Sequence, residues 1–185
     1  PTKLCVAFPD PDRAWHQRSG WVVDLTYAQT DVDYWQIDSL SQRVQQSTDK
    51  GLRVLIRVDY APEQSLPPEG DEGAVDAYLD HVRMLARDER LRQVYAYIIG
   101  TGFNASDSNR IAPDVPITPA WYATLFNGVD ADAPNGTEER TSVVETIRTN
   151  NTGARVLVGP VRPWNADQNG SVRFEIDAPV SYTHL

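Results

Sequence analysis

Groups of polar and aromatic residues follow three apolar segments of this 185-residue sequence. The groups are Arg57-Val58-Asp59-Tyr60, Gly100-Thr101-Gly102-Phe103-Asn104 and Gly159-Pro160-Val161-Arg162-Pro163-Trp164-Asn165. Carboxylate, guanidinium, hydroxyl and amide groups form hydrogen bonds with a polar ligand, whereas an indole ring offers a flat apolar face. We therefore expect one ligand-binding site made of Arg57, Asp59, Thr101, Asn104, Trp164 and Asn165.

The side chains of residues 52–59 alternate between the two faces of a predicted strand. Val54, Ile56 and Val58 share one face, which leaves Arg57 and Asp59 on the other. Charged groups packed against covering helices are costly in free energy. The alternation therefore predicts that Arg57 and Asp59 face the ligand.

A second strand, residues 20–27, has the same kind of alternation. Asp24 and Thr26 alternate with Val23 and Leu25, so we expect Asp24 and Thr26 to point the same way as Arg57. An alternative stays open, in which Arg57 forms a buried ion pair with Asp24 or Asp59 and only fills space.

The tryptophans divide into two groups. Trp21, Trp35 and Trp121 lie within predicted elements or at their ends and are interpreted as core residues. Trp164 follows a strand beside short polar residues, where an indole suits stacking on the C–H face of a sugar ring. Trp15 and His16 are weaker candidates of the same kind, and Asp10, Asp12 and Tyr27 also follow strands.

Five apolar strands alternate with amphipathic helices along the chain. Strands are predicted at residues 3–8, 20–27, 52–59, 94–99 and 154–159, and helices at 33–50, 72–87, 118–127 and 138–150. This alternation is typical of an α/β fold with a parallel sheet. Two architectures fit: an open doubly wound sheet, or the first five strands of an eight-stranded (β/α)8 TIM-type barrel, which needs roughly 250 residues.

Composition narrows the classes of partner and cofactor. A formal net charge of −9 argues against nucleic acid as a partner, and no apolar run is long enough for a membrane span. No glycine-rich nucleotide-binding motif follows any strand, so no cofactor is expected. One cysteine, with His16 and His81, is too few residues for a multi-thiolate or multi-histidine metal site.

The last seven residues differ in character from the rest of the chain. Residues 179–185, Pro-Val-Ser-Tyr-Thr-His-Leu, resemble the translated read of a sequencing adapter, as found in metagenomic sequences. We therefore expect one barrel-type domain over residues 1–178 and a non-native tail over 179–185, and His184 is excluded from functional consideration.

Three segments together resemble the (β/α)8 glycoside hydrolases of the cellulase-like clan. They are residues 52–59, residues 94–100 with the Ile117-Thr118-Pro119-Ala120-Trp121-Tyr122 stretch, and residues 154–165. The resemblance implies a bacterial protein that binds a saccharide at the carboxyl ends of the strands, with an extracellular location plausible.

The resemblance fails at the residue that matters most for hydrolysis. The clan's fourth strand ends in Asn-Glu, and the Glu is the general acid/base, but Thr101 and Gly102 stand at these positions. The clan's nucleophile comes from a seventh strand. We therefore expect that this chain does not hydrolyse glycosides by itself. A longer parent either binds carbohydrate without hydrolysing it or uses a displaced acid such as Asp107. The alternatives are a non-catalytic binding or scaffolding barrel, and an open α/β domain with a small-molecule site.

Overall fold

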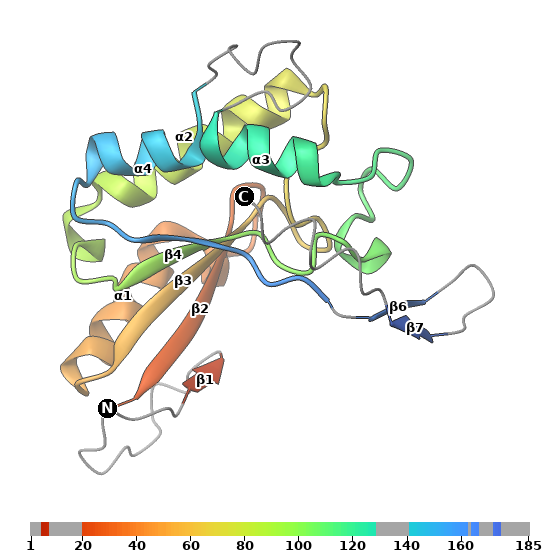
Figure 1. Cartoon of the computed structure of the whole chain (residues 1–185). Helices are drawn as coiled ribbons and strands as arrows, with labels where there is room; N and C mark the ends of the chain where they lie inside the picture. The colour runs from red at the N-terminus through yellow and green to blue at the C-terminus, as the bar shows by residue number, and fades with distance from the viewer. Residues whose placement is uncertain (1–4, 8–19, 129–140, 163, 167–171, 175–185) are drawn as a thin grey trace.

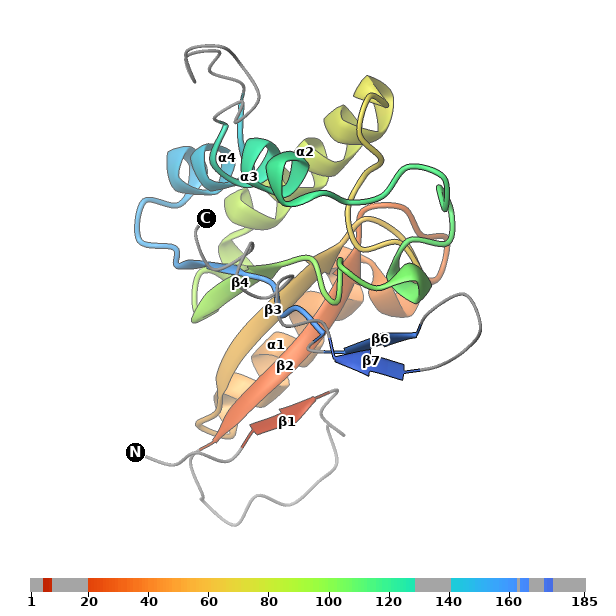
Figure 2. The ribbon, with the colours of Figure 1, turned by 45° about the vertical axis from the view of Figure 1, so that its right-hand side comes forward.

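The computed structural model describes residues 5–7, 20–128, 141–162, 164–166 and 172–174. Five strands form one sheet in the order β1-β2-β3-β4-β5, and every neighbouring pair is parallel. They are β1 (Cys5–Ala7), β2 (Trp21–Tyr27), β3 (Arg53–Asp59), β4 (Ala96–Ile99) and β5 (Val156–Val158). Figure 1 shows β2, β3 and β4 side by side, and Figure 2 shows β1 beside β2.

Helices connect β2 to β3, β3 to β4 and β4 to β5, as the alternating sequence pattern predicts. They are α1 (Ile37–Asp49), α2 (Glu72–Arg87), α3 (Pro119–Asn127) and α4 (Val143–Asn150), with the short 3-10 helices η1 (Asp33–Trp35), η2 (Glu89–Leu91) and η3 (Ser106–Ser108). The bounds of α2 agree with the prediction from sequence. The predicted helix over residues 33–50 is instead divided into η1 and α1.

Side-chain caps explain where three of the helices begin. The side chains of Asp71, Thr118 and Ser142 each accept a hydrogen bond from the backbone N–H three residues later. Pro119 follows Thr118 at the first helical position, as the sequence predicts. The last predicted helix begins at Val143 because Ser142 caps it there, and the residues expected before it, 138–140, lie outside the described residues.

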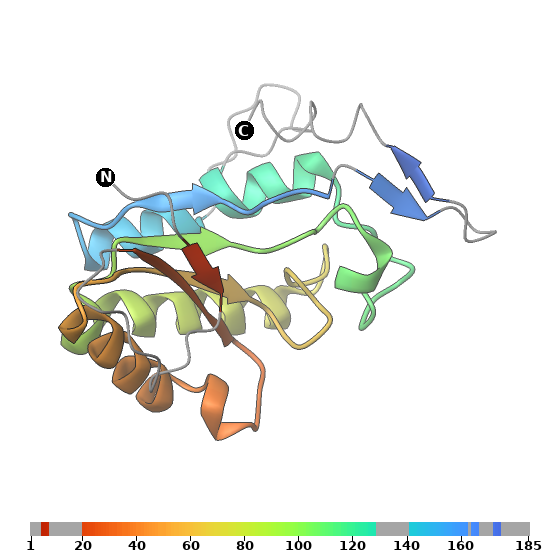
Figure 3. The same ribbon diagram turned by 90° about the horizontal axis from the view of Figure 1, so that it is seen from below.

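All four described α-helices pack against one face of the sheet. That face is lined on β3 by Val54, Ile56 and Val58, each 0% exposed, and they join residues of all four helices in one apolar core. In Figure 1 α2 and α4 lie side by side over this core, and Figure 3 shows the layers from below. Arg57 and Asp59 therefore lie on the opposite face, which confirms the alternation predicted for β3.

The prediction for Asp24 and Thr26 is wrong. Parallel pairing places Leu25 beside Arg57 and Tyr27 beside Asp59, so Asp24 and Thr26 share the helix-covered face. Asp24 accepts 2.9 Å hydrogen bonds at both carboxylate oxygens from Arg43 of α1. The suggested Asp24–Arg57 pair is therefore absent, and Arg43 is the partner that neutralises this buried carboxylate.

The Thr26 side chain also lies on the helix-covered face of the sheet. Its hydroxyl donates a 2.8 Å hydrogen bond to the Trp35 carbonyl and lies 3.1 Å from His81 Nε2. Because the hydroxyl hydrogen points to Trp35, the imidazole donates from Nε2 in this arrangement. Burial lowers the pKa of His81 to about 4, which favours the neutral imidazole.

A short hairpin follows the parallel sheet in a segment that sequence reasoning left irregular. Strands β6 (Trp164–Ala166) and β7 (Val172–Phe174) pair antiparallel. Asn169-Gly170 between them is a hairpin signal that the prediction did not use. The tail 179–185 lies outside the described residues.

The α/β class with a parallel sheet is thus confirmed. Among the described residues no helix is long and apolar enough to cross a membrane.

We expect Arg43→Met to lower the free energy of unfolding by about 3–5 kcal/mol, because Asp24 would remain buried without a counter-charge. Denaturant unfolding at pH 7 measures the loss. Arg83→Met is the matched control, since Arg83 pairs with Asp80 on the exposed face of α2 and such pairs contribute at most about 1 kcal/mol. Equal losses in the two variants would contradict this account.

Candidate ligand-binding site

Arg57 and Asp59 form an ion pair at the carboxyl end of β3. Arg57 Nη2 lies 3.1 Å from Asp59 Oδ2, and the Asp59 side chain is 8% exposed against 24% for Arg57. The other carboxylate oxygen, Oδ1, is buried and has no hydrogen-bond partner among the described residues. The pair proposed as an alternative from sequence therefore exists between Arg57 and Asp59, but it leaves one acceptor oxygen unsatisfied.

The environment of Asp59 favours its protonated form more than water does. Burial raises the pKa of Asp59 to about 7, although the charge of Arg57 and hydrogen bonds with Arg57 and Thr101 act in the opposite direction. Near neutral pH this carboxyl can therefore exchange a proton. Such a group can donate or accept a hydrogen bond, depending on what it meets.

Thr101 reaches the same place from the end of β4. Its backbone N–H donates a 2.7 Å hydrogen bond to Ser65 Oγ, and its hydroxyl donates to the Gly100 carbonyl at 2.9 Å. Gly100 has a φ of +71°, and an added Cβ would lie 2.8 Å from Ser65 Oγ. This tight turn holds Thr101 half-buried near Asp59.

Two loops at this end of the sheet are fused by a buried amide pair. Gln64 Nε2 donates to Asn109 Oδ1, and Asn109 Nδ2 donates to the carbonyls of Ala112 and Val115, each at 2.9 Å. Gln64 and Asn109 are 1% and 6% exposed. The amide pair therefore links the loop after β3 to the loop after β4 beside the site.

Tyr27 completes the group from the end of β2. Burial raises the pKa of Tyr27, and the negative charge of Asp59 raises it further. The charge of Arg57 and a hydrogen bond with Arg57 lower it. The following backbone runs along β3, since Ala28 N–H donates to the Asp59 carbonyl at 3.1 Å and Gln29 N–H to the Tyr60 carbonyl at 2.7 Å. The sequence prediction noted Tyr27 as a strand-end residue but did not place it among the ligand-binding residues.

The Asn104 side chain forms hydrogen bonds with the backbone of the segment after β5. Its amide donates to the Arg162 carbonyl at 2.7 Å and accepts from the Arg162 N–H at 2.8 Å. This two-bond pairing ties the loop after β4 to the segment after β5. The structure therefore brings Arg57, Asp59 and Thr101 together, and it commits the Asn104 amide to Arg162.

Gly102 occupies a backbone conformation that disfavours a side chain. Its φ is +57°, its N–H donates to the Pro160 carbonyl at 2.8 Å, and an added Cβ would lie 3.1 Å from Ser108 Oγ and 3.2 Å from Arg162 Nε. The position that the sequence comparison aligns with the acid/base of the cellulase-like clan is thus built around glycine here.

Asp107, the displaced acid suggested from sequence, forms an ion pair in the structure. Its Oδ2 lies 2.6 Å from Arg162 Nη1, and both side chains are nearly half exposed. This ion pair adds to the link between the loops that follow β4 and β5. The Asp107 side chain is also far more exposed than that of Asp59.

Other predicted residues lie outside the described part of the structure. The side chains of Trp164 and Asn165 are not described, and neither are Asp10, Asp12, Trp15 and His16. Trp121 is 7% exposed and is a core residue as predicted, whereas Trp21 and Trp35 are half-buried. The described residues contain no group of three or more metal-ligating side chains.

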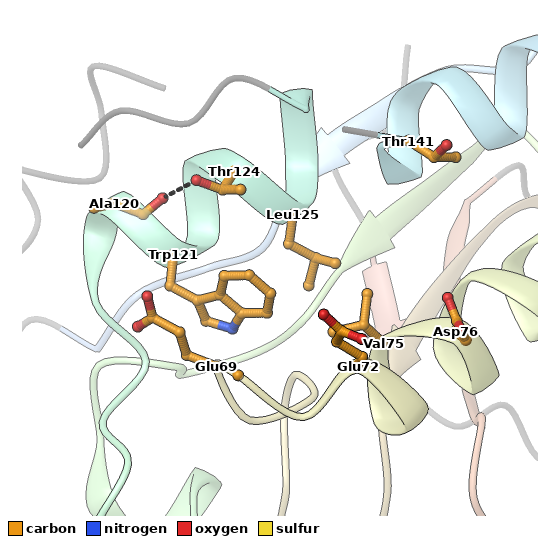
Figure 4. A pocket seen from close by; sticks show the side chains of 10 residues that line it. Glu69, Glu72, Val75, Asp76, Ala120, Trp121, Thr124, Leu125 and Thr141 are labelled. Atoms are coloured by element: carbon orange, nitrogen blue, oxygen red, sulfur yellow. Dashed lines mark hydrogen bonds between the residues drawn. The ribbon is translucent and has the colours of Figure 1, made fainter. Parts of the chain in front are cut away.

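A separate hollow of about 480 Å³ lies between the start of α2 and α3. Figure 4 shows the Trp121 indole beside Glu69, Glu72, Val75 and Leu125 in this hollow. The Trp121 N–H is bound to the Pro67 carbonyl at 3.0 Å, which fixes the ring in the core. Glu72 lies in the first turn of α2, where an acid is favoured by the helix dipole. The folded structure therefore explains why Trp121 and Glu72 occupy these positions, and neither residue needs a ligand to explain it.

We expect Asp59→Asn to change how stability depends on pH. The folded pKa of about 7 lies above the ordinary value of 3.8, so the wild type is stabilised relative to the variant below pH 4 and loses this advantage as pH rises through 7. The difference in unfolding free energy between the two proteins should move by a few kcal/mol in favour of Asn between pH 4 and pH 8. Denaturant unfolding at several pH values measures it, and a constant difference would contradict the assignment.

Gly102→Ala should lower the free energy of unfolding by about 1–2 kcal/mol, because alanine is strained at positive φ and meets Ser108 and Arg162. Gly153→Ala is the control, since Gly153 has an ordinary φ and its added Cβ would meet only Asn151 Oδ1, at 3.9 Å. A stabilised Gly102→Ala protein would show that the turn tolerates a side chain.

Neither known protein families nor curated proteins provide a match: no family model fits this chain, and no curated protein sequence is significantly similar to it.

Proposed function

We propose that this chain binds a saccharide at the carboxyl ends of β2, β3 and β4 and does not hydrolyse it. The carrying observation is the buried carboxyl of Asp59, whose Oδ1 has no hydrogen-bond partner among the described residues while Arg57 holds Oδ2. An unsatisfied buried acceptor is costly, and a ligand hydroxyl that reaches it removes that cost. The guanidinium of Arg57 lies beside this carboxyl, and the hydroxyl oxygen of Thr101 is a further acceptor.

We propose further that the five strands are the first part of a (β/α)8 barrel. Two observations support this architecture over a doubly wound sheet. The strands are consecutive in space, β1-β2-β3-β4-β5, and all four described α-helices pack on one face. A doubly wound sheet reverses its strand order and carries helices on both faces. Ligands of barrels bind at the carboxyl ends of the strands, where Arg57, Asp59 and Thr101 lie.

The absence of hydrolysis follows from the carboxyl groups. Retaining hydrolysis needs two carboxyl groups about 5–5.5 Å apart, and inversion needs two about 6.5–9.5 Å apart. Asp59 is one carboxyl group near the proposed saccharide. Gly102 offers none, and Asp107 is paired with Arg162. These features favour a non-catalytic carbohydrate-binding module, the alternative that Gly102 suggested from sequence.

Calorimetric titration with neutral β-linked gluco-, xylo- and manno-oligosaccharides tests the proposal. We expect at least one series to bind, and Asp59→Leu to weaken it by about 10- to 100-fold, since hydrogen bonds to charged groups contribute about 1.5–3 kcal/mol. Asp107→Asn is the matched control, because its carboxylate is exposed and paired elsewhere, and it should bind within twofold of wild type.

Two results would overturn the proposal. The first is no binding of any oligosaccharide, or equal binding by wild type and Asp59→Leu. The second is release of product from an aryl β-glycoside panel by the wild type that Asp107→Ala abolishes, which would identify a displaced acid.

A further inference from the structure

Three aromatic rings extend from the candidate site along the segment after β2. Tyr27 and Trp35 have ring centroids 5.6 Å apart at an interplanar angle of 80°, and Trp35 and Tyr34 have centroids 4.6 Å apart at 89°. Tyr27 is hydrogen-bonded with Arg57. The series thus leads from the polar group of Arg57 and Asp59 towards solvent, and we call it the aromatic platform.

The outer end of the aromatic platform is exposed. Tyr34 is 44% exposed and its loop neighbour Val32 is 48% exposed, and both are among the few large apolar side chains exposed in the described part of the chain. Trp35 and Tyr27 are half-buried. Partly exposed aromatic rings beside a polar site are typical of ligand-binding surfaces.

Buried polar groups hold this exposed loop from beneath. Arg43 donates from Nη1 to the Tyr34 carbonyl while its other nitrogens bind Asp24, and Thr26 Oγ1 donates to the Trp35 carbonyl at 2.8 Å. The Arg43 guanidinium also lies 4.0 Å from the centroid of the Tyr34 ring. The ring is therefore supported on its protein side by a buried cation, and its exposed area lies away from Arg43.

Two different buried groups hold the backbone of the outer rings. Arg43, paired with Asp24, binds the Tyr34 carbonyl, and Thr26 binds the Trp35 carbonyl, so the backbone that carries both rings is held before any ligand arrives. Preorganised aromatic rings bind with little loss of conformational entropy. Sugar rings carry C–H groups on their faces, and these pack favourably on aromatic faces and edges.

We propose that Tyr34 and Trp35 form a stacking subsite for a sugar unit next to the one bound by Arg57, Asp59 and Thr101. This inference rests on the proposed function and adds the length of the ligand to it. Successive ring centroids from Tyr27 to Tyr34 lie 5.6 Å and 4.6 Å apart, and we expect a ligand that contacts both the polar group and Tyr34 to have more than one sugar unit. The ligand is therefore an oligosaccharide, and a monosaccharide occupies only the polar end.

Calorimetry with the mono-, di-, tri- and tetrasaccharide of the series that binds tests the subsite. We expect wild-type affinity to rise with ligand length, and Tyr34→Ala to remove about 3- to 10-fold of the tetrasaccharide affinity, the range of one aromatic contact of about 0.5–1.5 kcal/mol. Monosaccharide affinity should stay unchanged. Trp35→Phe should retain more affinity than Trp35→Ala because it keeps a ring.

Val32→Ala is the matched control, since it removes exposed apolar area from the same loop without removing a ring, and its affinity should equal that of wild type. Tyr34 is exposed enough for its alanine variant to fold even if Trp35→Ala does not, and a thermal melt verifies this. Suppose that Asp59→Leu weakens binding as expected, but Tyr34→Ala and Trp35→Ala bind ligands of every length like wild type. The proposed subsite is then wrong, and the proposed function stands. If no saccharide binds wild type, both are wrong.

Discussion

The parallel register between β2 and β3 is the constraint on which the candidate site depends. Tyr27 lies beside Asp59 and Leu25 beside Arg57, so the face of β3 that carries the charged pair also carries Tyr27. A shift of one residue would exchange the two faces of β2 and bring Asp24 next to the pair. The observed register instead sends Asp24 and Thr26 under the helices, where they support the loop that holds Tyr34 and Trp35.

The sequence alone was enough to predict β3, because its two faces differ strongly. Val54, Ile56 and Val58 are fully buried, and only one assignment keeps Arg57 and Asp59 away from the helices. Strand β2 is different, since its polar residues Asp24 and Thr26 lie on the helix-covered face, whereas Val23 and Leu25 lie on the other. The deciding partner of Asp24 is Arg43, distant along the chain, which lies with Leu40, Val44 and Ser47 on the buried stripe of α1. An arginine within such a stripe was the available signal for a buried counter-charge.

Other features depend on backbone geometry that residue types do not reveal. The motif comparison identified Gly102 as a missing carboxyl group, but the positive φ shows that the loop is built for glycine. In the same way, the roles of Asn104 and Asp107 depend on Arg162, which belongs to a segment after a different strand. The sequence does not predict the aromatic platform, because Trp35 lies at the start of a predicted helix, which favours a core position for its ring. The run Tyr34-Trp35 shortly after Tyr27 was the signal for it.

The two buried aspartates, Asp24 and Asp59, differ in how their carboxylate oxygens are hydrogen-bonded. Asp24 accepts from Arg43 at both oxygens and from the Leu25 N–H at 2.8 Å, so folding alone satisfies it. Asp59 is buried to a similar degree and also pairs with an arginine, yet Oδ1 has no partner among the described residues and its pKa is raised to about 7. A carboxyl that only stabilised the fold would gain from a second donor, as Asp24 does. The unsatisfied oxygen at the strand ends, next to preorganised rings, is therefore the feature that a hydroxyl-bearing ligand explains best.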